Sequence, residues 1–161
     1  MAAATAASLF GRRGALINDG SRIGFGSHSH KLGDTVAFGV VTLNARGEGA
    51  VHIRDARITG VPDGLQIVAV HAVKAGESPL IGALREPPER DPRIHLHPLS
   101  DIRVVPGAQA RLWYLLVVAR IIKPGTWRTR GIEVSWKRGI WRGRTHFHHY
   151  IEVTTEHELF N

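Results

Sequence analysis

Two neighbouring segments, residues 126–137 and 142–155, alternate apolar and polar side chains on either side of Gly139-Ile140. Alternation with a period of two is typical of β-strands that have one buried face. A Gly-X pair at the centre fits a two-residue type II′ turn. This turn sets three opposite pairs: Trp136 with Gly143, Val134 with Thr145, and Ile132 with Phe147. The segment therefore predicts a β-hairpin with a fixed register.

The predicted register separates the side chains of the hairpin into two faces of opposite character. The apolar face has Ile132, Val134, Trp136, Phe147, Ile151 and Val153. The polar face has Glu133, Ser135, Lys137, Arg142, Arg144 and His146. A shift of one residue would exchange the faces, so the agreement of both arms favours this register.

Further strands are predicted along the chain from residue 35. Residues 35–43 and 65–73 are apolar on both faces, and residues 50–59 alternate, with a change of phase near Arg54-Asp55 that indicates a bulge. The run 108–122 is rich in β-branched and aromatic residues, which favours a strand over a helix. Residues 102–105 predict a short strand.

Residues 74–101 contain five prolines and are interpreted as a long connection with one short strand around 94–96. Proline has no N–H for a sheet ladder and breaks a helix interior, so neither a central strand nor a helix is expected there.

Seven or eight short strands without a helical period predict a single antiparallel β-sandwich of immunoglobulin-like architecture, with a small closed barrel as the alternative. The sandwich is expected to span residues 34–155 of the 161. Residues 1–33 predict a flexible, disordered basic tail rich in Gly, Ser and His, because they offer little apolar surface to bury. Residues 156–161 predict a short C-terminal tail.

The sequence has no cysteine, which excludes a disulfide framework, thiolate metal sites and a cysteine nucleophile. No apolar run approaches the roughly 20 residues of a membrane-spanning helix. The first residues are Ala-rich, and Arg12-Arg13 follows them rather than preceding them. We therefore expect no signal peptide in this chain.

Three segments resemble a loose group of actinobacterial proteins. They are DTVAFGVVTL at 34–43, VHIRDAR at 51–57 and PGTWRTRGIEVSW at 124–136. The group consists of small exported or membrane-anchored immunoglobulin-like domains of unassigned function, often with an N-terminal anchor and a cysteine pair. The sequence given shows neither feature. The resemblance implies an immunoglobulin-like fold and a setting at the bacterial cell envelope.

Nearly all of the formal charge of +7 lies in the hairpin region. Between Lys123 and Tyr150 there are seven basic residues and one acid, Glu133. Arginine binds phosphate and carboxylate through a planar donor fork. The residues expected to meet an anionic surface of a protein or membrane are Arg128, Arg130, Lys137, Arg138, Trp141, Arg142 and Arg144. Nucleic acid is a less favoured partner because no nucleic-acid motif is present, and a solvated basic hairpin without a specific ligand is the other interpretation.

A histidine pair on the same hairpin gives a second hypothesis. His146 and His148 are two residues apart, so on one strand both imidazoles face the same side. Glu133 lies opposite His146 in the predicted register, and His149 points the other way. Together His146, His148 and Glu133 predict a divalent metal site for zinc or copper. The alternative is that these are surface imidazoles without a metal.

No enzymatic activity or small-molecule substrate is expected. The carboxylates are scattered, no serine lies in a nucleophile-elbow pattern, and the glycines at 24–26 lack the remainder of a phosphate loop. Ser100 and Asp101 lie near His97 in the sequence, but such proximity does not establish a catalytic triad. The predicted function is that of a non-enzymatic interaction domain.

Overall fold

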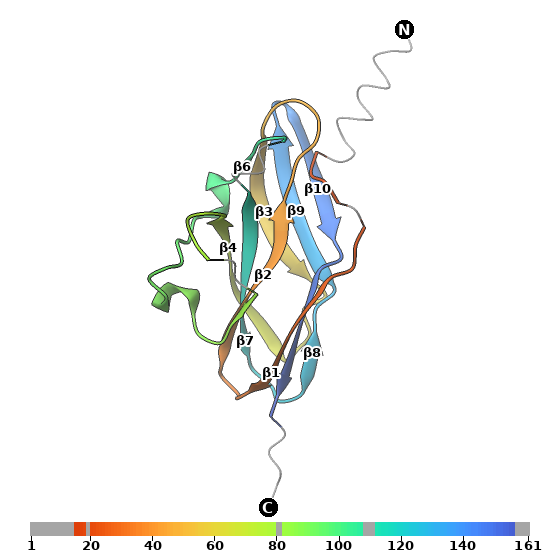
Figure 1. Cartoon of the computed structure of the whole chain (residues 1–161). Helices are drawn as coiled ribbons and strands as arrows, with labels where there is room; N and C mark the ends of the chain where they lie inside the picture. The colour runs from red at the N-terminus through yellow and green to blue at the C-terminus, as the bar shows by residue number, and fades with distance from the viewer. Residues whose placement is uncertain (1–14, 19, 80–81, 108–111, 157–161) are drawn as a thin grey trace, which may run out of the picture.

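The computed structural model describes residues 15–18, 20–79, 82–107 and 112–156. Within them the chain forms eleven strands, two 3-10 helices and no α-helix. Figure 1 shows an elongated β-structure with the turn between β9 and β10 at one end and the turn between β1 and β2 at the other. The prediction of an all-β fold is therefore confirmed.

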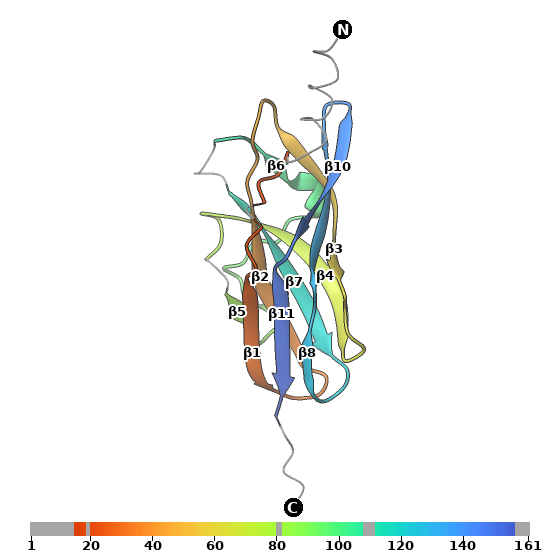
Figure 2. The ribbon, with the colours of Figure 1, turned by 90° about the vertical axis from the view of Figure 1, so that its right-hand side faces the viewer.

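The strands form three sheets. The first has the order β4 (Leu65–Lys74), β7 (Trp113–Ile121), β2 (Thr35–Leu43), β5 (Ala83–Leu84). The second has the order β10 (Trp141–Phe147), β9 (Gly131–Arg138), β3 (Val51–Thr59), β6 (Arg103–Val104). The third has β11 (Tyr150–Thr155) between β1 (Gly24–His30) and β8 (Thr126–Arg128), as Figure 2 shows.

The main core is formed by side chains from all three sheets. Phe38 of the first sheet, Trp136 of the second and Ile151 of the third are each at most 2 % exposed and belong to one cluster. Burial of apolar surface contributes roughly 25 cal/mol per Å², so this common core is what holds the sheets together.

The first sheet is also covered on its other face, which explains why its strands are apolar on both sides. Val73, Leu116 and Val118 form a second buried cluster with Ile94 of the proline-rich connection. The Tyr114 hydroxyl donates a hydrogen bond of 2.9 Å to the Pro79 carbonyl. The connection contains the 3-10 helices Pro88–Arg90 and Leu99–Asp101. The strand predicted around 94–96 is not formed, and His97 makes an isolated bridge to Ala72 instead.

The hairpin register is confirmed at all three predicted pairs. Gly139 has a φ of 55°, and Ile140 is not among the described residues with positive φ. One positive φ at the first turn position is the signature of a type II′ turn, whose twist matches that of the strands. The bulge predicted at Arg54-Asp55 is also present, between Ile53 and Asp55 in the pairing of β3 with β9.

Each hairpin arm is interrupted where the hairpin passes from the second sheet to the third. Phe147 faces Ile132, but Val153 faces Trp127, so the pairing has moved by one residue. The shift places Trp127 against the core and Arg128 outside, opposite Glu152. Without it, the predicted alternation would set Arg128 opposite the buried Ile151.

Three parts of the predicted architecture are wrong. The described residues form eleven strands in three sheets, not the seven or eight strands of one sandwich. The strands are not wholly antiparallel, because β1 pairs with β11 in parallel. Residues 1–33 are not a uniform flexible tail: residues 24–30 form β1, Leu16 bridges to Ala45, and Leu16 and His30 are each 1 % exposed. Tertiary contacts offset the conformational entropy that these residues lose on ordering, which their polar local sequence could not offset by itself.

Residues 1–14 of the predicted N-terminal tail and 157–161 of the predicted C-terminal tail lie outside the described residues. In the described part of the chain, no helix is long and apolar enough to cross a membrane.

Candidate functional site: a basic sheet face and a polar hollow

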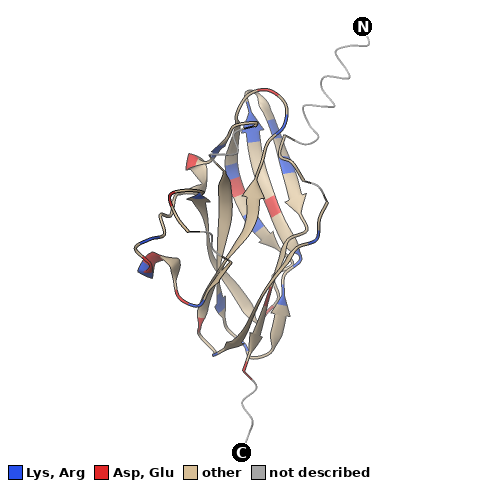
Figure 3. Cartoon of the chain, viewed as in Figure 1, with Lys and Arg blue, Asp and Glu red and all other residues tan. Residues whose placement is uncertain are grey.

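The outer face of the second sheet brings basic side chains from four strands into one row. Register pairs join Arg103 of β6 to His52 of β3, His52 to Lys137 of β9, and Lys137 to Arg142 of β10. None of these four side chains has an ion-pair partner among the described residues. Because neighbouring strands are about 4.8 Å apart, the row places the cations Arg103, Lys137 and Arg142 close together around the His52 imidazole. Figure 3 shows the positive charges on these strands.

The next rows along the same face mix the two signs of charge. Asp55, Ser135 and Arg144 are opposite one another, followed by Arg57, Glu133 and His146. The Glu133 carboxylate lies 2.8 Å from the Arg57 guanidinium and 3.6 Å from that of Arg144. The positive charge therefore dominates at the end of the sheet near the turn.

Near that end, Arg54 joins Arg142 and Arg144 around a shallow cavity of about 340 Å³. Arg54 is the extra residue of the β3 bulge, and it is exposed. A bulge changes the direction in which a side chain is presented, which here adds a third guanidinium to those of the hairpin.

The turn between β9 and β10 is apolar at its apex and basic on both sides. Ile140 is 88 % exposed, more than any other large apolar side chain of the described chain, and Trp141 is 38 % exposed. Arg138 donates a hydrogen bond of 2.5 Å to the Arg46 carbonyl of the turn between β2 and β3. This bond holds the two turns together at one end of the molecule.

Two of the predicted anion-binding residues lie elsewhere. The Arg128 guanidinium contacts the Glu152 carboxylate at 2.7 Å and lies over the Tyr150 ring at 4.5 Å. Its charge is thus already paired. Arg130 lies between β8 and β9, with its side chain against Gly60. The structure therefore divides the predicted set between the turn and the junction of the second and third sheets.

At that junction there is a hollow of about 540 Å³. Its wall includes Arg22, Thr59, Arg130, His146, His148 and Tyr150. The two imidazole rings are 4.9 Å apart between centroids in an edge-on arrangement. Residues of both sequence hypotheses, the basic set and the histidine pair, thus line one cavity.

The predicted metal ligands are not gathered into a site. His146 is opposite Glu133, as expected, but the carboxylate of Glu133 is engaged by Arg57. Among the described residues, no group of three or more His, Asp or Glu side chains is placed to hold a metal ion. His149 does point away, with its Nδ1 2.6 Å from the Val40 carbonyl oxygen.

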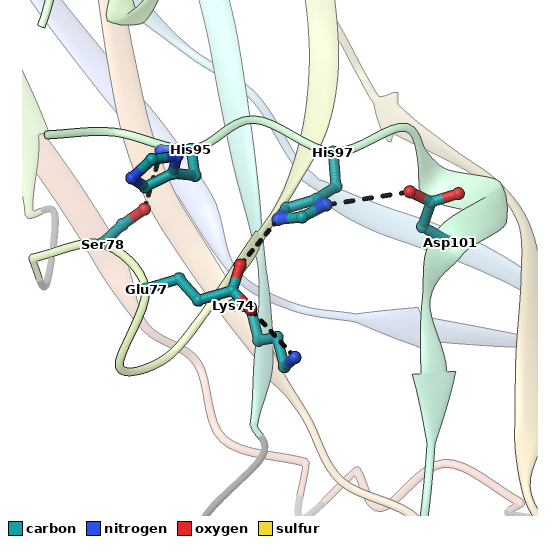
Figure 4. Close-up of polar contacts among 6 residues, drawn as sticks. All are labelled: Lys74, Glu77, Ser78, His95, His97 and Asp101. Carbon is teal, nitrogen blue, oxygen red and sulfur yellow. Dashed lines mark hydrogen bonds and ion pairs between the residues drawn. The ribbon is translucent and has the colours of Figure 1, made fainter. Parts of the chain in front are cut away.

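His97 lies between two carboxylates rather than beside a serine. Its Nε2 is 3.0 Å from Glu77 and its Nδ1 is 3.7 Å from Asp101, as Figure 4 shows. A hydrogen bond from Lys74, and to a lesser degree one from His97, holds the pKa of the Glu77 carboxyl below its usual value. Since Ser100 makes no hydrogen bond to His97, this group joins the proline-rich connection to β4 and forms no catalytic triad.

Sequence reasoning missed the contributions of His52, Arg54, Arg103 and Arg22. The alternation in residues 50–59 marks His52 as lying on the polar face of its strand. It does not identify β9 as the neighbouring strand, and no local signal places Arg22 beside the hairpin.

A scan against protein-family models gave no match, and neither did a search of curated proteins. Among solved structures, a similar one is the VesB protease of Vibrio cholerae, with 10 % sequence identity and a TM-score of 0.45. The match covers 88 % of this chain and 32 % of the protease chain, so this chain spans about a third of that protein. At this distance the similarity carries no inference about activity.

Proposed function

We propose that this chain is a non-enzymatic interaction domain that docks against an anionic membrane surface through the end of the β9–β10 hairpin. Lys137, Arg138, Arg142 and Arg144 supply the positive charge, and Ile140 and Trp141 supply the apolar contact. The observation that carries the proposal is the exposure of Ile140 between basic residues on both sides of the turn.

The electrostatic part of the proposal rests mainly on three basic side chains without an ion-pair partner among the described residues: Lys137, Arg138 and Arg142. Arg144 adds a guanidinium that lies 3.6 Å from the Glu133 carboxylate. A basic residue close to an anionic bilayer contributes about 1 kcal/mol. Lys137 and Arg142 lie side by side on the outer face, while Arg138 lies beside Trp141 across the two strands. Whichever way the turn tilts, a cation meets the headgroups. Glu48 in the neighbouring turn has the opposite charge, and Arg46 of the same turn offsets it.

The apolar part favours a membrane over an acidic protein. Tryptophan prefers the bilayer interface, where its ring is apolar and its N–H stays hydrated. An isoleucine at the apex of a tight turn contributes nothing to the core when 88 % of it is exposed. Insertion into the headgroup region would remove that apolar surface from water.

The setting and the finer class of the fold belong to the same proposal. We assign the packed sheets to an immunoglobulin-like sandwich, with β1 as a parallel addition at one side. The resemblance of residues 34–155 to envelope proteins supports a place at the bacterial envelope, where anionic lipid surfaces are available.

Co-sedimentation with vesicles tests this function. We expect the full chain to bind phosphatidylcholine vesicles that contain phosphatidylglycerol and to be released from them at high salt. We expect no binding to vesicles of phosphatidylcholine alone. Reversing two charges in Arg142→Glu/Arg144→Glu removes about 1 kcal/mol per lost cation and weakens binding about 30-fold or more.

The apolar contribution has a matched control at the opposite end of the molecule. Leu32 is 62 % exposed and follows Lys31, so Leu32→Ser removes a similar side chain beside a similar charge. Ile140→Ser is expected to weaken vesicle binding about tenfold and Leu32→Ser to leave it unchanged. Salt-independent binding, or equal loss in both variants, contradicts docking through the hairpin.

A further inference from the structure

The hollow at the junction of the second and third sheets is separate from the exposed turn. It is bounded by the end of β3, the link between β8 and β9, and the link between β10 and β11. Arg130 precedes β9 and Ile140 follows it, ten residues later, so at about 3.3 Å per residue the hollow lies roughly 30 Å from the apex of the turn. A ligand here need not touch the surface on which the turn docks.

Three side chains of the hollow each lie across a glycine. A Cβ at Gly60 would come within 2.3 Å of the Arg130 side chain, one at Gly131 within 2.8 Å of His146 Nε2, and one at Gly24 within 2.3 Å of the Tyr150 ring. Only residues without a Cβ leave room for these side chains to lie flat on the backbone. The walls of the hollow are thereby fixed by packing.

Two arginines of the hollow have no counter-charge in the part of the chain that the structure describes. Arg128 is neutralised by Glu152, but Arg22 and Arg130 have no ion-pair partner among the described residues. Both side chains are exposed. His146 and His148 add ring nitrogens that hydrogen bond in either protonation state.

One wall of the hollow has a polar atom without a partner. The Thr59 hydroxyl is buried and makes no hydrogen bond in the structure. A buried hydroxyl left unpaired costs on the order of 1–3 kcal/mol, and such groups are rare in folded proteins. Because less than 1 Å² of the hydroxyl oxygen is exposed, it does not contact a ligand in the hollow without a rotation of the Thr59 side chain.

We propose that this hollow binds the phosphate group of a small soluble phosphomonoester. Two unpaired guanidinium groups, two imidazoles and the Tyr150 hydroxyl match a phosphate with two negative charges and three acceptor oxygens better than a carboxylate with one charge and two oxygens. A volume of about 540 Å³ exceeds a bare phosphate and lies in the range of small-molecule sites. The proposal goes beyond the docking function and does not depend on it.

Titration of the full ¹⁵N-labelled chain with glycerol 3-phosphate, followed by amide chemical shifts at constant ionic strength, tests the site. We expect saturable shifts at Gly60, Gly131 and His148. Arg130→Gln keeps an aliphatic stem over Gly60 and removes the charge. Loss of one charge-assisted contact is expected to weaken binding about tenfold or more. Arg142→Gln, an unpaired arginine near the turn, should change the affinity less than twofold.

Arg22→Gln provides a second variant if Arg130→Gln fails to fold. Shifts that do not saturate, that spread over all exposed arginines, or that persist unchanged in both variants overturn the proposal. Vesicle binding is then measured on Arg130→Gln and phosphate binding on Ile140→Ser. We expect each variant to lose only its own ligand, so that failure of either function is recognised separately. Loss of both ligands in one variant contradicts two independent sites.

Discussion

Substitution of Gly131 by alanine tests whether the close packing at the junction is as tight as the structure shows. A Cβ at this position would lie 2.4 Å from the Phe147 carbonyl oxygen and 2.8 Å from His146 Nε2. The first distance is 1.0 Å short of the 3.4 Å at which ordinary contact begins. The obstructing oxygen belongs to the backbone of β10, so it cannot rotate aside and the two strands must separate.

The expected cost follows from two opposing effects. Inserting a methyl group into a packed site costs about 1–3 kcal/mol. Replacing glycine by alanine also restricts the unfolded chain, which returns about 0.4–1 kcal/mol. The net destabilisation is about 1–2 kcal/mol, which lowers the Tm of a domain of this size by about 2–8 °C. Because His146 is also displaced, the folded variant should bind glycerol 3-phosphate more weakly than the natural chain.

Thermal unfolding followed by circular dichroism measures the effect, with Gly82→Ala as the control. A Cβ at Gly82 meets nothing within 4 Å, and its φ is not positive. Gly82→Ala should therefore leave the Tm unchanged or raise it slightly. A Gly131→Ala variant that unfolds at the same temperature as the natural chain, with undiminished phosphate binding, would refute the reasoning.

Three further predictions concern buried polar groups. Thr129 is 3 % exposed and its hydroxyl accepts a hydrogen bond of 3.0 Å from the Ile151 N–H, so Thr129→Val should cost about 1–3 kcal/mol in urea unfolding. Thr59→Val removes an unpartnered hydroxyl and should leave the stability unchanged or higher. A loss of stability equal to that of Thr129→Val would show that the hydroxyl has a partner. Burial, and then the charge of Arg85, lower the pKa of His30 below 6.5. The unfolded chain then holds the proton more tightly than the folded chain, so the free energy of unfolding should be largest above about pH 6.5 and fall as the pH drops through the lowered pKa. His30→Gln should flatten this pH dependence in unfolding measurements between pH 5 and 8. An unchanged profile in the variant would contradict the assignment to His30.

Local pattern was sufficient for features that depend on a few neighbouring residues, but not for the one-residue shift by which the hairpin passes from the second sheet to the third. The register around Gly139-Ile140, the bulge at Arg54-Asp55 and the strand character of 113–121 were all predictable, because turn geometry and period-two alternation act over a few residues. Residues 24–30 were wrongly predicted to belong to a flexible tail, because their polar local pattern carries no information about distant partners. Their order comes from pairing with β11, a strand more than a hundred residues away in the chain.

The two candidate sites differ in the same way: one depends on local sequence and the other on tertiary packing. The exposed Ile140 and the basic residues around it follow from the hairpin alone, so the sequence was enough to locate that surface. The hollow did not follow from it. Arg22, Thr59, Arg130 and His148 belong to four separate segments, and only the one-residue shift between the second and third sheets, together with glycines that leave room at the backbone, brings them around one cavity. Alternation sets which face a side chain occupies, whereas the packing of the sheets decides what lies beside it.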